Sequence, residues 1–481
     1  MQLNALELTS FAGGRFLLPV EAEKIIVKGI CWDSREVSVG DLYLAIPGSR
    51  VDGHDFVADC ISKGASACLI EHALDDRQME SIAGSNAALI LVDSVIGALE
   101  RIAAAWRQKA GATVIVLTGS SGKTTTKNLM SRVLSSFGPT IATIGNQNNE
   151  LGVPATLLRI DPETRFAVVE MGMRGLHQLE LLCAFAQPDM ALVTNVGTSH
   201  MELLGSRENI ARAKAEPFAS LREGGVAFIN SSDEYANCLR DFGNTRRPGI
   251  EEVFFDGSGV DPQSYPIDIR PKVYASDVQV NDRGCASFVL HLPNGQAECS
   301  LGIAGLHNVH NACAAAAVGW KLGMDAHRIA GALAGAQAVA GRQQVLCASC
   351  GATVIDDTYN ANPDSMKASL AMFASMDVEG RRFAVLGDMG ELGDFTEAGH
   401  ALVGECAVGA KVDRLYCVGA LSKGIAAAAL RAGMPEDAVW HTEDVGLLIS
   451  RLKDEIGQGD AVLVKASHSM ALERIVEGLI D

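Results

Sequence analysis

Short apolar runs and amphipathic stretches alternate along most of the chain, and this alternation predicts an α/β protein. In residues 86–335 each β-branched run is followed by helical spacing, which favours a mostly parallel sheet with helices on both faces. The strands expected in this central unit are Ala87 to Val92, Val114 to Leu117, Phe166 to Glu170, Met190 to Thr194 and Gly225 to Ile229. Ligands collect at the carboxyl ends of such strands, so polar residues there are candidates for a site.

Two further α/β units flank the central one, and the length of 481 residues suits three domains. Residues 1–85 predict a small unit, with strands near Lys24 to Trp32 and Asp41 to Ile46 and a helix from His54 into Lys63. Residues 336–481 predict a Rossmann-like unit, with strands at Ala352 to Asp356, Arg382 to Leu386, Arg414 to Val418 and Ala461 to Val464.

The clearest chemical signal is the segment ATVIVLTGSSGKTTTKNLM at residues 112–130, which predicts a strand, a tight turn and a helix that begins at Lys123. Gly119 and Gly122 allow backbone N–H groups to face an anion at the helix N-terminus. Lys123 would hold terminal phosphates and Thr124 a magnesium ion. Because Leu117 stands where the common G-x-x-x-x-G-K-[ST] pattern has glycine, an ordinary glycine-rich turn remains an alternative for this segment alone.

Composition narrows the class of partner. A net charge of −18 argues against nucleic acid and against an anionic membrane surface. No signal peptide precedes the first strand and no apolar run approaches 18 residues, so we expect a cytoplasmic protein without membrane insertion. In a reducing compartment we expect most of the twelve cysteines, such as Cys183, Cys238 and Cys313, to be small buried apolar residues. Cys347 and Cys350 form one CxxC pair, a weak indication of a zinc or redox site.

Glu170 and His200, near the expected strand ends, have two interpretations each, and Lys214 has one. Glu170 is either a magnesium ligand or part of a surface salt bridge. His200, in NVGTSHMELLGS, is either a structural histidine or a metal or phosphate contact. Lys214 lies on an expected helix and by its spacing alone is a solvated lysine.

Polar strings elsewhere also have two interpretations. GNQNNELGVP at residues 145–154 contains more hydrogen-bonding groups than a turn needs, which indicates contacts with substrate amides. Asn308 either caps an Ala-rich helix or shares a binding face with Asn311. The strings DSR at residues 33–35 and DGHDF at residues 52–56 are, taken alone, more typical of solvated turns and caps.

Taken in order, these strings resemble the Mur ligases, the ATP-dependent amide-forming enzymes of peptidoglycan precursor synthesis. The matching pieces are DSR, TGSSGKTTT, GNQNNELGVP, VVEMG, TNVGTSHMELLGS, AKAE, GLHNVHNA, GRQQ, DDTYNANPDSM and LGDMGELG. The resemblance implies three domains, one each for the UDP end of a precursor, for ATP and for the incoming amino component.

Within the family, DxYNANPxSM followed by GDMxELG is similar to the members that add D-alanyl-D-alanine to UDP-N-acetylmuramoyl-tripeptide. Tyr359, Asn360 and Asn362 decide this interpretation. The alternatives are a sister ligase that adds a single amino acid, a folylpolyglutamate synthetase-like ligase and, from another class, a nucleotide-hydrolysing regulatory protein.

The resemblance also implies roles for individual residues, in a chain expected to be a monomer. Catalysis would use Lys123, His200 and Lys214, and two Mg²⁺ ions would be held by Thr124, Glu170, His200 and Lys214, the last of these carbamylated. ATP would contact Gly119, Ser120, Ser121, Gly122, Lys123, Thr124, Thr125, Asn308, Asn311, Arg342 and Asp357. The two peptide substrates would contact Ser34, Arg35, Asp52, His54, Asn146, Asn148, Asn149, Tyr359, Asn360, Asn362 and His468. His468 departs from the family, which often has arginine there, so a permanent charge is lost.

Overall fold

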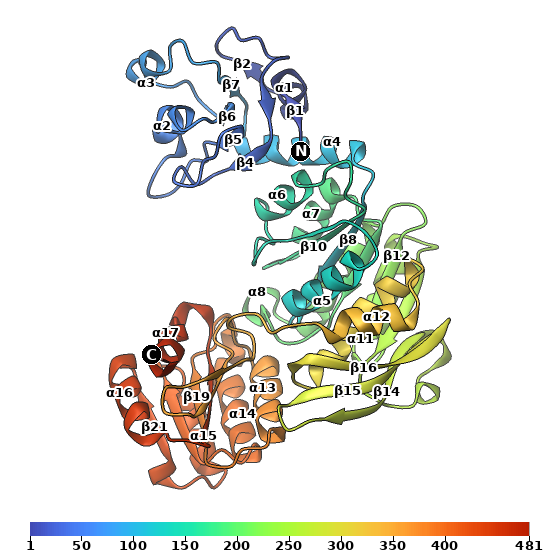
Figure 1. Cartoon of the computed structure of the whole chain (residues 1–481), viewed down its shortest axis with the longest axis vertical. Coiled ribbons are helices and arrows are strands. Elements are labelled where there is room, and N and C mark those ends of the chain that lie inside the picture. The colour runs from blue at the N-terminus through green and yellow to red at the C-terminus, as the bar shows by residue number, and fades with distance from the viewer. Residues whose placement is uncertain (481) are drawn as a thin grey trace.

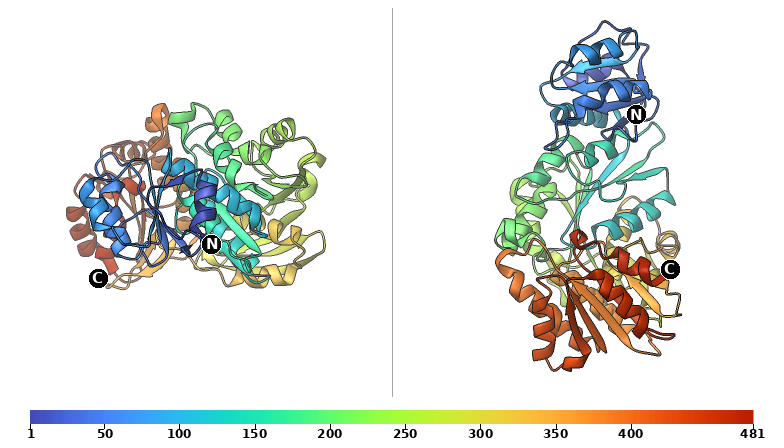
Figure 2. Two further views of the ribbon diagram at one scale, coloured as in Figure 1. Left: turned by 90° about the horizontal axis from the view of Figure 1, so that it is seen from above. Right: turned by 90° about the vertical axis from the view of Figure 1, so that its left-hand side faces the viewer.

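A computed structural model describes residues 1–480, which form three α/β parts in a row. The N-terminal part lies at one end, the central part in the middle and the C-terminal part against the far side of the central part (Figures 1 and 2). Each of the three larger sheets belongs to one part, which confirms the predicted α/β class.

The N-terminal part is built on a five-stranded sheet in the order β2-β7-β6-β5-β4, with β1 and β3 as a separate pair. Strand β7 runs parallel to β6 and antiparallel to β2, so the prediction that this run belongs to the central sheet is wrong. Its residues Ala88–Leu91 are almost entirely buried, and an apolar run of this kind does not reveal which sheet it joins. The elements are β1 (Leu3–Asn4), α1 (Ala5–Ala12), β2 (Arg15–Phe16), β3 (Ile26–Val27), β4 (Gly29–Cys31), β5 (Asp41–Leu44), α2 (Val57–Ser62), β6 (Ala67–Ile70), α3 (Asp76–Ser81) and β7 (Ala88–Leu91).

The central part has a nine-stranded sheet in the order β16-β15-β14-β13-β12-β11-β8-β10-β9. Pairing is parallel from β9 to β14, as predicted. The elements are α4 (Val95–Lys109), β8 (Thr113–Thr118), α5 (Lys123–Ser135), β9 (Thr140–Ala142), α6 (Gly152–Leu158), β10 (Phe166–Glu170), α7 (Gln178–Ala186), β11 (Met190–Val193), α8 (Met201–Leu204), α9 (Arg207–Ala219), β12 (Val226–Asn230), α10 (Ala236–Arg246), β13 (Glu251–Asp256), β14 (Val273–Val280), β15 (Cys285–Leu292), β16 (Gly295–Ala304), α11 (His307–Lys321) and α12 (Ala326–Ala334).

An antiparallel extension completes the central sheet. Strands β14, β15 and β16 form a meander whose side chains alternate between buried and exposed, as expected for strands with one solvated face. Our strand predictions did not include it, although its alternation of apolar and polar positions is the usual signal. The meander lies beside the C-terminal part (Figure 1).

The C-terminal part has a six-stranded sheet in the order β17-β18-β22-β19-β20-β21. The four predicted strands are present, and the edge strands β17 and β21 were not predicted. The elements are β17 (Gln344–Cys347), β18 (Thr353–Asp356), α13 (Pro363–Ser375), β19 (Arg382–Gly387), α14 (Thr396–Gly409), β20 (Arg414–Val418), α15 (Lys423–Arg431), β21 (Val439–Thr442), α16 (Val445–Glu455), β22 (Ala461–Lys465) and α17 (Glu473–Ile480).

One apolar cluster continues from the N-terminal part into the central part. Leu8 of α1 and Ile102 of α4 belong to the same buried group as Leu157 of α6 and Leu179 of α7. Helix α4 therefore anchors the N-terminal part on the central one. In residues 1–480 we find no helix with the length and apolar character needed to cross a membrane.

Candidate active site

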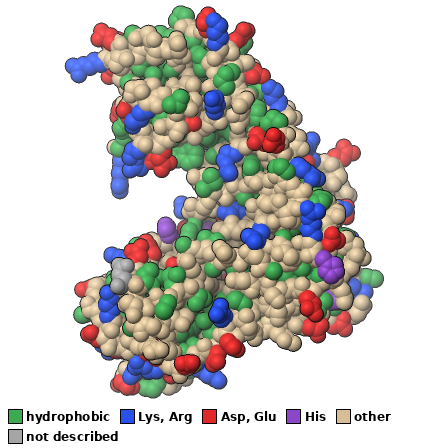
Figure 3. Space-filling model, in the orientation of Figure 1, with side chains coloured by type: hydrophobic (Ala, Val, Ile, Leu, Met, Phe, Trp, Pro, Cys, Tyr) green, Lys and Arg blue, Asp and Glu red, His purple; other side chains and the backbone are tan. Residues whose placement is uncertain are grey.

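A cleft of about 1740 Å³ lies where the three parts meet. The space-filling view shows the molecule hollowed between its N-terminal end and its C-terminal part (Figure 3). The wall comes from every part of the chain, including Trp32, the segment after β8, the asparagine-rich loop, the start of α11 and three loops of the C-terminal part. Of the predicted site residues, the cleft is lined by Ser120, Ser121, Gly122, Lys123, Thr124, Thr125, Asn146, Asn148, Asn149, Glu170, His200, Asn308, Asn311, Arg342, Asp357, Tyr359, Asn360, Asn362 and His468.

The turn between β8 and α5 needs glycine at two positions. Gly119 has φ +153°, and a Cβ there would lie 1.8 Å from Thr194 Oγ1. Gly122 has φ +76°, and a Cβ there would lie 2.6 Å from Asn311 Oδ1. The backbone can turn tightly and approach both neighbours only because these residues have no side chain. Close neighbours therefore explain why these two positions of the predicted phosphate loop hold glycine.

Some backbone amides of the turn are bonded within the protein, and those of residues 122–125 lie between the bonded ones. Ser120 N–H donates to Asn195 O at 3.1 Å, and Ser121 N–H donates to Asn195 Oδ1 at 2.9 Å. The first backbone hydrogen bond of the helix is donated by Thr126 to Gly122, at 2.8 Å. The amides of residues 122–125 have no acceptor within the helix and can face an anion. An anion site therefore uses the helix start, while Ser120 and Ser121 brace the loop.

Three cationic or titratable side chains lie close together behind this turn. Lys123 Nζ donates to Gly119 O at 2.8 Å. Lys214 on α9 is only 1% exposed, so its interpretation as a solvated lysine is wrong. Burial, with the charge of Lys123 as a smaller cause, holds the pKa of Lys214 well below its usual value. Burial, followed by the charges of Lys214 and Lys123, lowers the pKa of His200 to about 4.

Glu170 ends β10 inside the protein rather than on its surface. It is 1% exposed, so the interpretation as a surface salt bridge is wrong. Its Oε1 accepts a hydrogen bond from Asn148 Nδ2 at 2.9 Å, whereas Oε2 is buried without a hydrogen-bond partner among residues 1–480. The nearest paired cation, Lys127 Nζ, is 3.6 Å from Oε2. A buried carboxylate oxygen without a partner is costly unless a cation completes the site, and hard divalent cations prefer oxygen ligands. The residues present therefore suit a magnesium ion.

The structure contradicts the interpretation that Asn308 caps helix α11. Leu306 is the N-cap residue, and Asn308 lies inside the helix, where it is 4% exposed. Asn308 Nδ2 donates to Ala304 O at 2.6 Å, and Asn311 Nδ2 donates to Asn308 Oδ1 at 2.8 Å. Asn311 Oδ1 in turn accepts from Thr126 Oγ1 at 3.0 Å. The two asparagines form one chain of amides that ends at the phosphate-loop helix.

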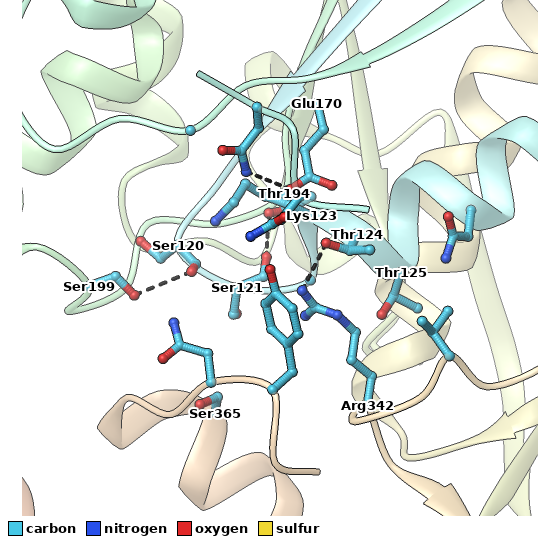
Figure 4. A pocket seen from close by; sticks show the side chains of 18 of the residues that line it. Ser120, Ser121, Lys123, Thr124, Thr125, Glu170, Thr194, Ser199, Arg342 and Ser365 are labelled. Carbon is cyan, nitrogen blue, oxygen red and sulfur yellow. Dashed lines mark hydrogen bonds between the residues drawn. The ribbon is translucent and has the colours of Figure 1, made fainter. Parts of the chain in front are cut away.

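Arg342 joins the C-terminal part to the phosphate loop. Its Nη2 donates to Thr124 Oγ1 at 2.9 Å (Figure 4). Its guanidinium carbon lies 4.0 Å from the centre of the Tyr359 ring. His468 stacks on Tyr359 with 5.5 Å between ring centres. The arginine is thus held between an aromatic ring and the helix start.

Asp357 is fixed by neighbours from its own part. It is buried, pairs with Lys465 Nζ at 2.8 Å and accepts a hydrogen bond from Ser369. Lys465 Nζ also donates to Asn360 O at 2.9 Å. These contacts hold the end of β18 and the Asn360 loop in one position at the cleft.

A short seam, defined by Gly197–Glu202 on one side and Asn362, Asp364 and Glu391 on the other, joins the central and C-terminal parts. Asp364 Oδ2 accepts from Thr198 N–H at 2.8 Å and from Thr198 Oγ1 at 2.9 Å, and Asn362 Nδ2 donates to Ser199 Oγ at 2.5 Å. His200 Nδ1 lies 2.8 Å from Glu391 Oε2. Asp364 and Glu391 were not predicted, because only the folded chain brings them to the site. Lys127 was also not predicted, although its place four residues after Lys123 on the same helix is a signal that the sequence carries.

The four predicted residues of the N-terminal part lie outside the cleft wall. Arg35 is exposed and pairs with Asp33, beside Ser34 in the same turn. His54 is buried, with Nδ1 2.7 Å from Asp52 Oδ1, and its Nε2 accepts from Glu71 N–H at 2.8 Å. Both ring nitrogens of His54 are therefore in use, and the role of this segment toward a UDP group stays a prediction.

The cysteines are all free thiols in residues 1–480. Cys183 and Cys313 are buried as predicted, whereas Cys238 is only partly buried. Cys347 and Cys350 are exposed, and neither belongs to a group of potential metal ligands found among the described residues.

Comparisons with known proteins agree with this geometry. Residues 26–107 match the Mur ligase family catalytic domain, residues 117–319 the Mur ligase middle domain, and residues 341–468 the Mur ligase glutamate ligase domain. The chain belongs to the Mur ligase family, as its resemblance predicted.

The similarity within this family is full-length. The "UDP-N-acetylmuramoyl-tripeptide--D-alanyl-D-alanine ligase" of Bacillus subtilis (strain 168) is 35% identical over 459 residues, which cover 95% of this chain and 94% of that protein. A crystal structure of MurF from Acinetobacter baumannii matches with a TM-score of 0.84 at 31% identity, over 100% of this chain and 99% of that one. MurF ligase from Thermotoga maritima in complex with ADP matches with a TM-score of 0.78 at 26% identity, over 94% and 97%.

Proposed function

We propose that this chain joins D-alanyl-D-alanine to UDP-N-acetylmuramoyl-tripeptide, coupled to the cleavage of ATP to ADP and phosphate. The observation that carries the proposal is the single cleft in which the helix start at Lys123 and the buried carboxylate of Glu170 face the Tyr359–Asn362 loop. Full-length relatives with this activity in their name support the choice of substrates. Such substrates place the reaction in the cytoplasm.

The reaction proceeds in two steps that balance. The terminal carboxylate of the tripeptide attacks the γ-phosphorus of ATP, so a C–O–P bond forms and ADP leaves. The neutral amine of the dipeptide then attacks the acyl carbon, an amide bond forms, and phosphate and a proton leave. Because two anions must approach each other, the protein has to supply positive charge at the phosphates.

The central part supplies that charge and the nucleotide site. Lys123 and the free amides at the start of α5 bind the terminal phosphates. Asn308 and Asn311 line the same cleft, and their hydrogen-bonded pair would form the wall beside the adenosine group. The MurF structure from Thermotoga maritima contains ADP, which supports a nucleotide in the corresponding place.

The carboxylate and hydroxyl groups beside the phosphates suit magnesium. Thr124 and Glu170 would hold one ion, and His200 with a carbamylated Lys214 would complete a second site. When bound, magnesium neutralises charge on the phosphates and the attacking carboxylate. The low pKa of Lys214 favours the neutral amine, which is the form that reacts with carbon dioxide.

The C-terminal part completes the site from the opposite side. Arg342 and Asp357 reach the phosphates and ribose, and the Tyr359–Asn362 loop with His468 receives the dipeptide. The N-terminal part, including Ser34, Arg35, Asp52 and His54, receives the UDP end. Contact between the C-terminal and central parts keeps water away from the acyl phosphate, because water would hydrolyse this intermediate.

Replacing Asp357 by asparagine is expected to lower turnover about a hundredfold while the dissociation constant of the UDP-precursor changes less than about twofold. Asparagine removes the charge but keeps an acceptor for the buried Lys465, so folding is affected less than by alanine. Steady-state phosphate release and calorimetric titration of the precursor measure the two quantities. Equal losses in both would contradict a role confined to the nucleotide and domain closure.

The function itself is tested by phosphate release with ATP, magnesium and UDP-N-acetylmuramoyl-tripeptide, combined with D-alanyl-D-alanine, with single amino acids or with no amine. We expect release that depends on the dipeptide, and mass spectrometry should identify the pentapeptide product. Release with a single amino acid would indicate a sister ligase, and a glutamate-adding activity on a folate would indicate a folylpolyglutamate synthetase. Release without any amine would indicate a nucleotide hydrolase.

A further inference from the structure

The asparagine-rich loop is attached directly to the carboxylate at the end of β10. Asn148 Nδ2 donates to Glu170 Oε1 at 2.9 Å, and Asn148 O accepts from Gly172 N–H at 2.8 Å. A Cβ at Gly172 would lie 2.8 Å from Asn148 Oδ1, so glycine permits this close approach. The side chain of Asn148 therefore has a defined partner inside the protein, although the sequence pattern assigned it to the substrate.

Lys127 attaches the same loop from the other side. It lies one helical turn beyond Lys123, its side chain is 3% exposed, and its Nζ donates to Gly145 O at 2.8 Å. The same Nζ lies 3.6 Å from Glu170 Oε2. Helix α5, the loop and the end of β10 thus meet at Glu170.

We propose that Asn148 is a positioning residue that orients Glu170 for the metal ion. This role of Asn148 rests on the proposed function, in which Glu170 is a magnesium ligand. A carboxylate has two equivalent oxygens, and the amide donor of Asn148 occupies one of them while the other lacks a hydrogen-bond partner among the described residues. A donor fixed on one oxygen prevents rotation of the carboxylate and leaves the second oxygen for a cation. Groups that hold a metal ligand in this way contribute about 10-fold to 100-fold to metal affinity in other proteins.

Asn146 offers a matched control within the same loop. It is also an asparagine and also lines the cleft, yet it makes no hydrogen bond to Glu170. If the loss of any amide side chain from this loop weakened metal binding, substitution of either asparagine would do so. The proposed role predicts weaker metal binding for Asn148 alone.

The test is Mn²⁺ titration of the full-length, ADP-bound protein by electron paramagnetic resonance, with Mn²⁺ in place of Mg²⁺. Asn148→Ala is expected to weaken Mn²⁺ binding by about 10-fold to 100-fold, and Asn146→Ala by less than about twofold. In a Glu170→Gln background, Asn148→Ala should add less than about twofold, because its effect passes through Glu170. Asn148→Leu, which keeps the side-chain size, replaces alanine if the smaller variant fails to fold.

The outcomes separate the inference from the proposed function. A thermal midpoint that falls without a change in Mn²⁺ affinity would make Asn148 a merely structural residue and overturn the inference. Unchanged Mn²⁺ affinity in Glu170→Gln would instead remove Glu170 from the metal site, and with it the metal part of the proposed function. If Asn148→Ala and Glu170→Gln each weaken Mn²⁺ binding, and the double variant is no weaker than Glu170→Gln alone, the result supports the inference and the metal part of the proposed function.

Discussion

Replacing Lys123 by methionine is expected to lower the rate of phosphate release about a thousandfold or more. Methionine has a similar length but no charge, so the terminal phosphates lose the cation that lies at the start of α5. Lys123 is partly buried in the wall of the cleft, and a charge in such surroundings stabilises a developing anion more than it does in water. The measurement is dipeptide-dependent phosphate release at saturating substrates.

Lys453→Met on the exposed side of α16 is the control, and its turnover should equal that of the unaltered protein. The UDP-precursor should bind Lys123→Met with nearly unaltered affinity, since this lysine faces the nucleotide. A variant that keeps more than about a tenth of the turnover would show that Lys123 is not the principal phosphate ligand.

Replacing Lys214 by methionine is expected to lower turnover by on the order of a hundredfold to a thousandfold. The side chain is buried, so methionine fits the space and removes only the nitrogen that would be carbamylated. Thermal stability should not fall, because burying the polar nitrogen of Lys214 without an ion pair among the described residues is itself unfavourable.

Carbon-13 bicarbonate distinguishes this role from packing. The unaltered protein should show a carbamate resonance in the NMR spectrum, and Lys214→Met should lack it. A resonance that persists in the variant would place the carbamate on another lysine. Full turnover in the variant would remove Lys214 from the reaction.

The sequence predicted those features that depend on local patterns. The β8 strand, the glycines of the turn and the start of α5 at Lys123 follow from periodicity and from the backbone freedom of glycine, and all three are present. The domain-scale alternation of strand and helix also gave the parallel sheets correctly.

Features that depend on packing between distant segments were not predicted. The run Ala88–Leu91 joins the N-terminal sheet because β6 offers it an edge, which an apolar run cannot specify. Lys214 is buried because α9 turns it inward, and its local spacing gave no sign of this. Asp364 and Glu391 reach the seam only through the docking of the C-terminal part.

The seam also limits which residue position 197 can hold. A Cβ at this position would lie 2.4 Å from Asp364 Oδ2, so alanine would displace the Asp364 carboxylate from its two hydrogen bonds with Thr198. Any residue larger than glycine at position 197 would therefore loosen the contact between the central and C-terminal parts at this point, although it would leave every residue of the phosphate loop in place.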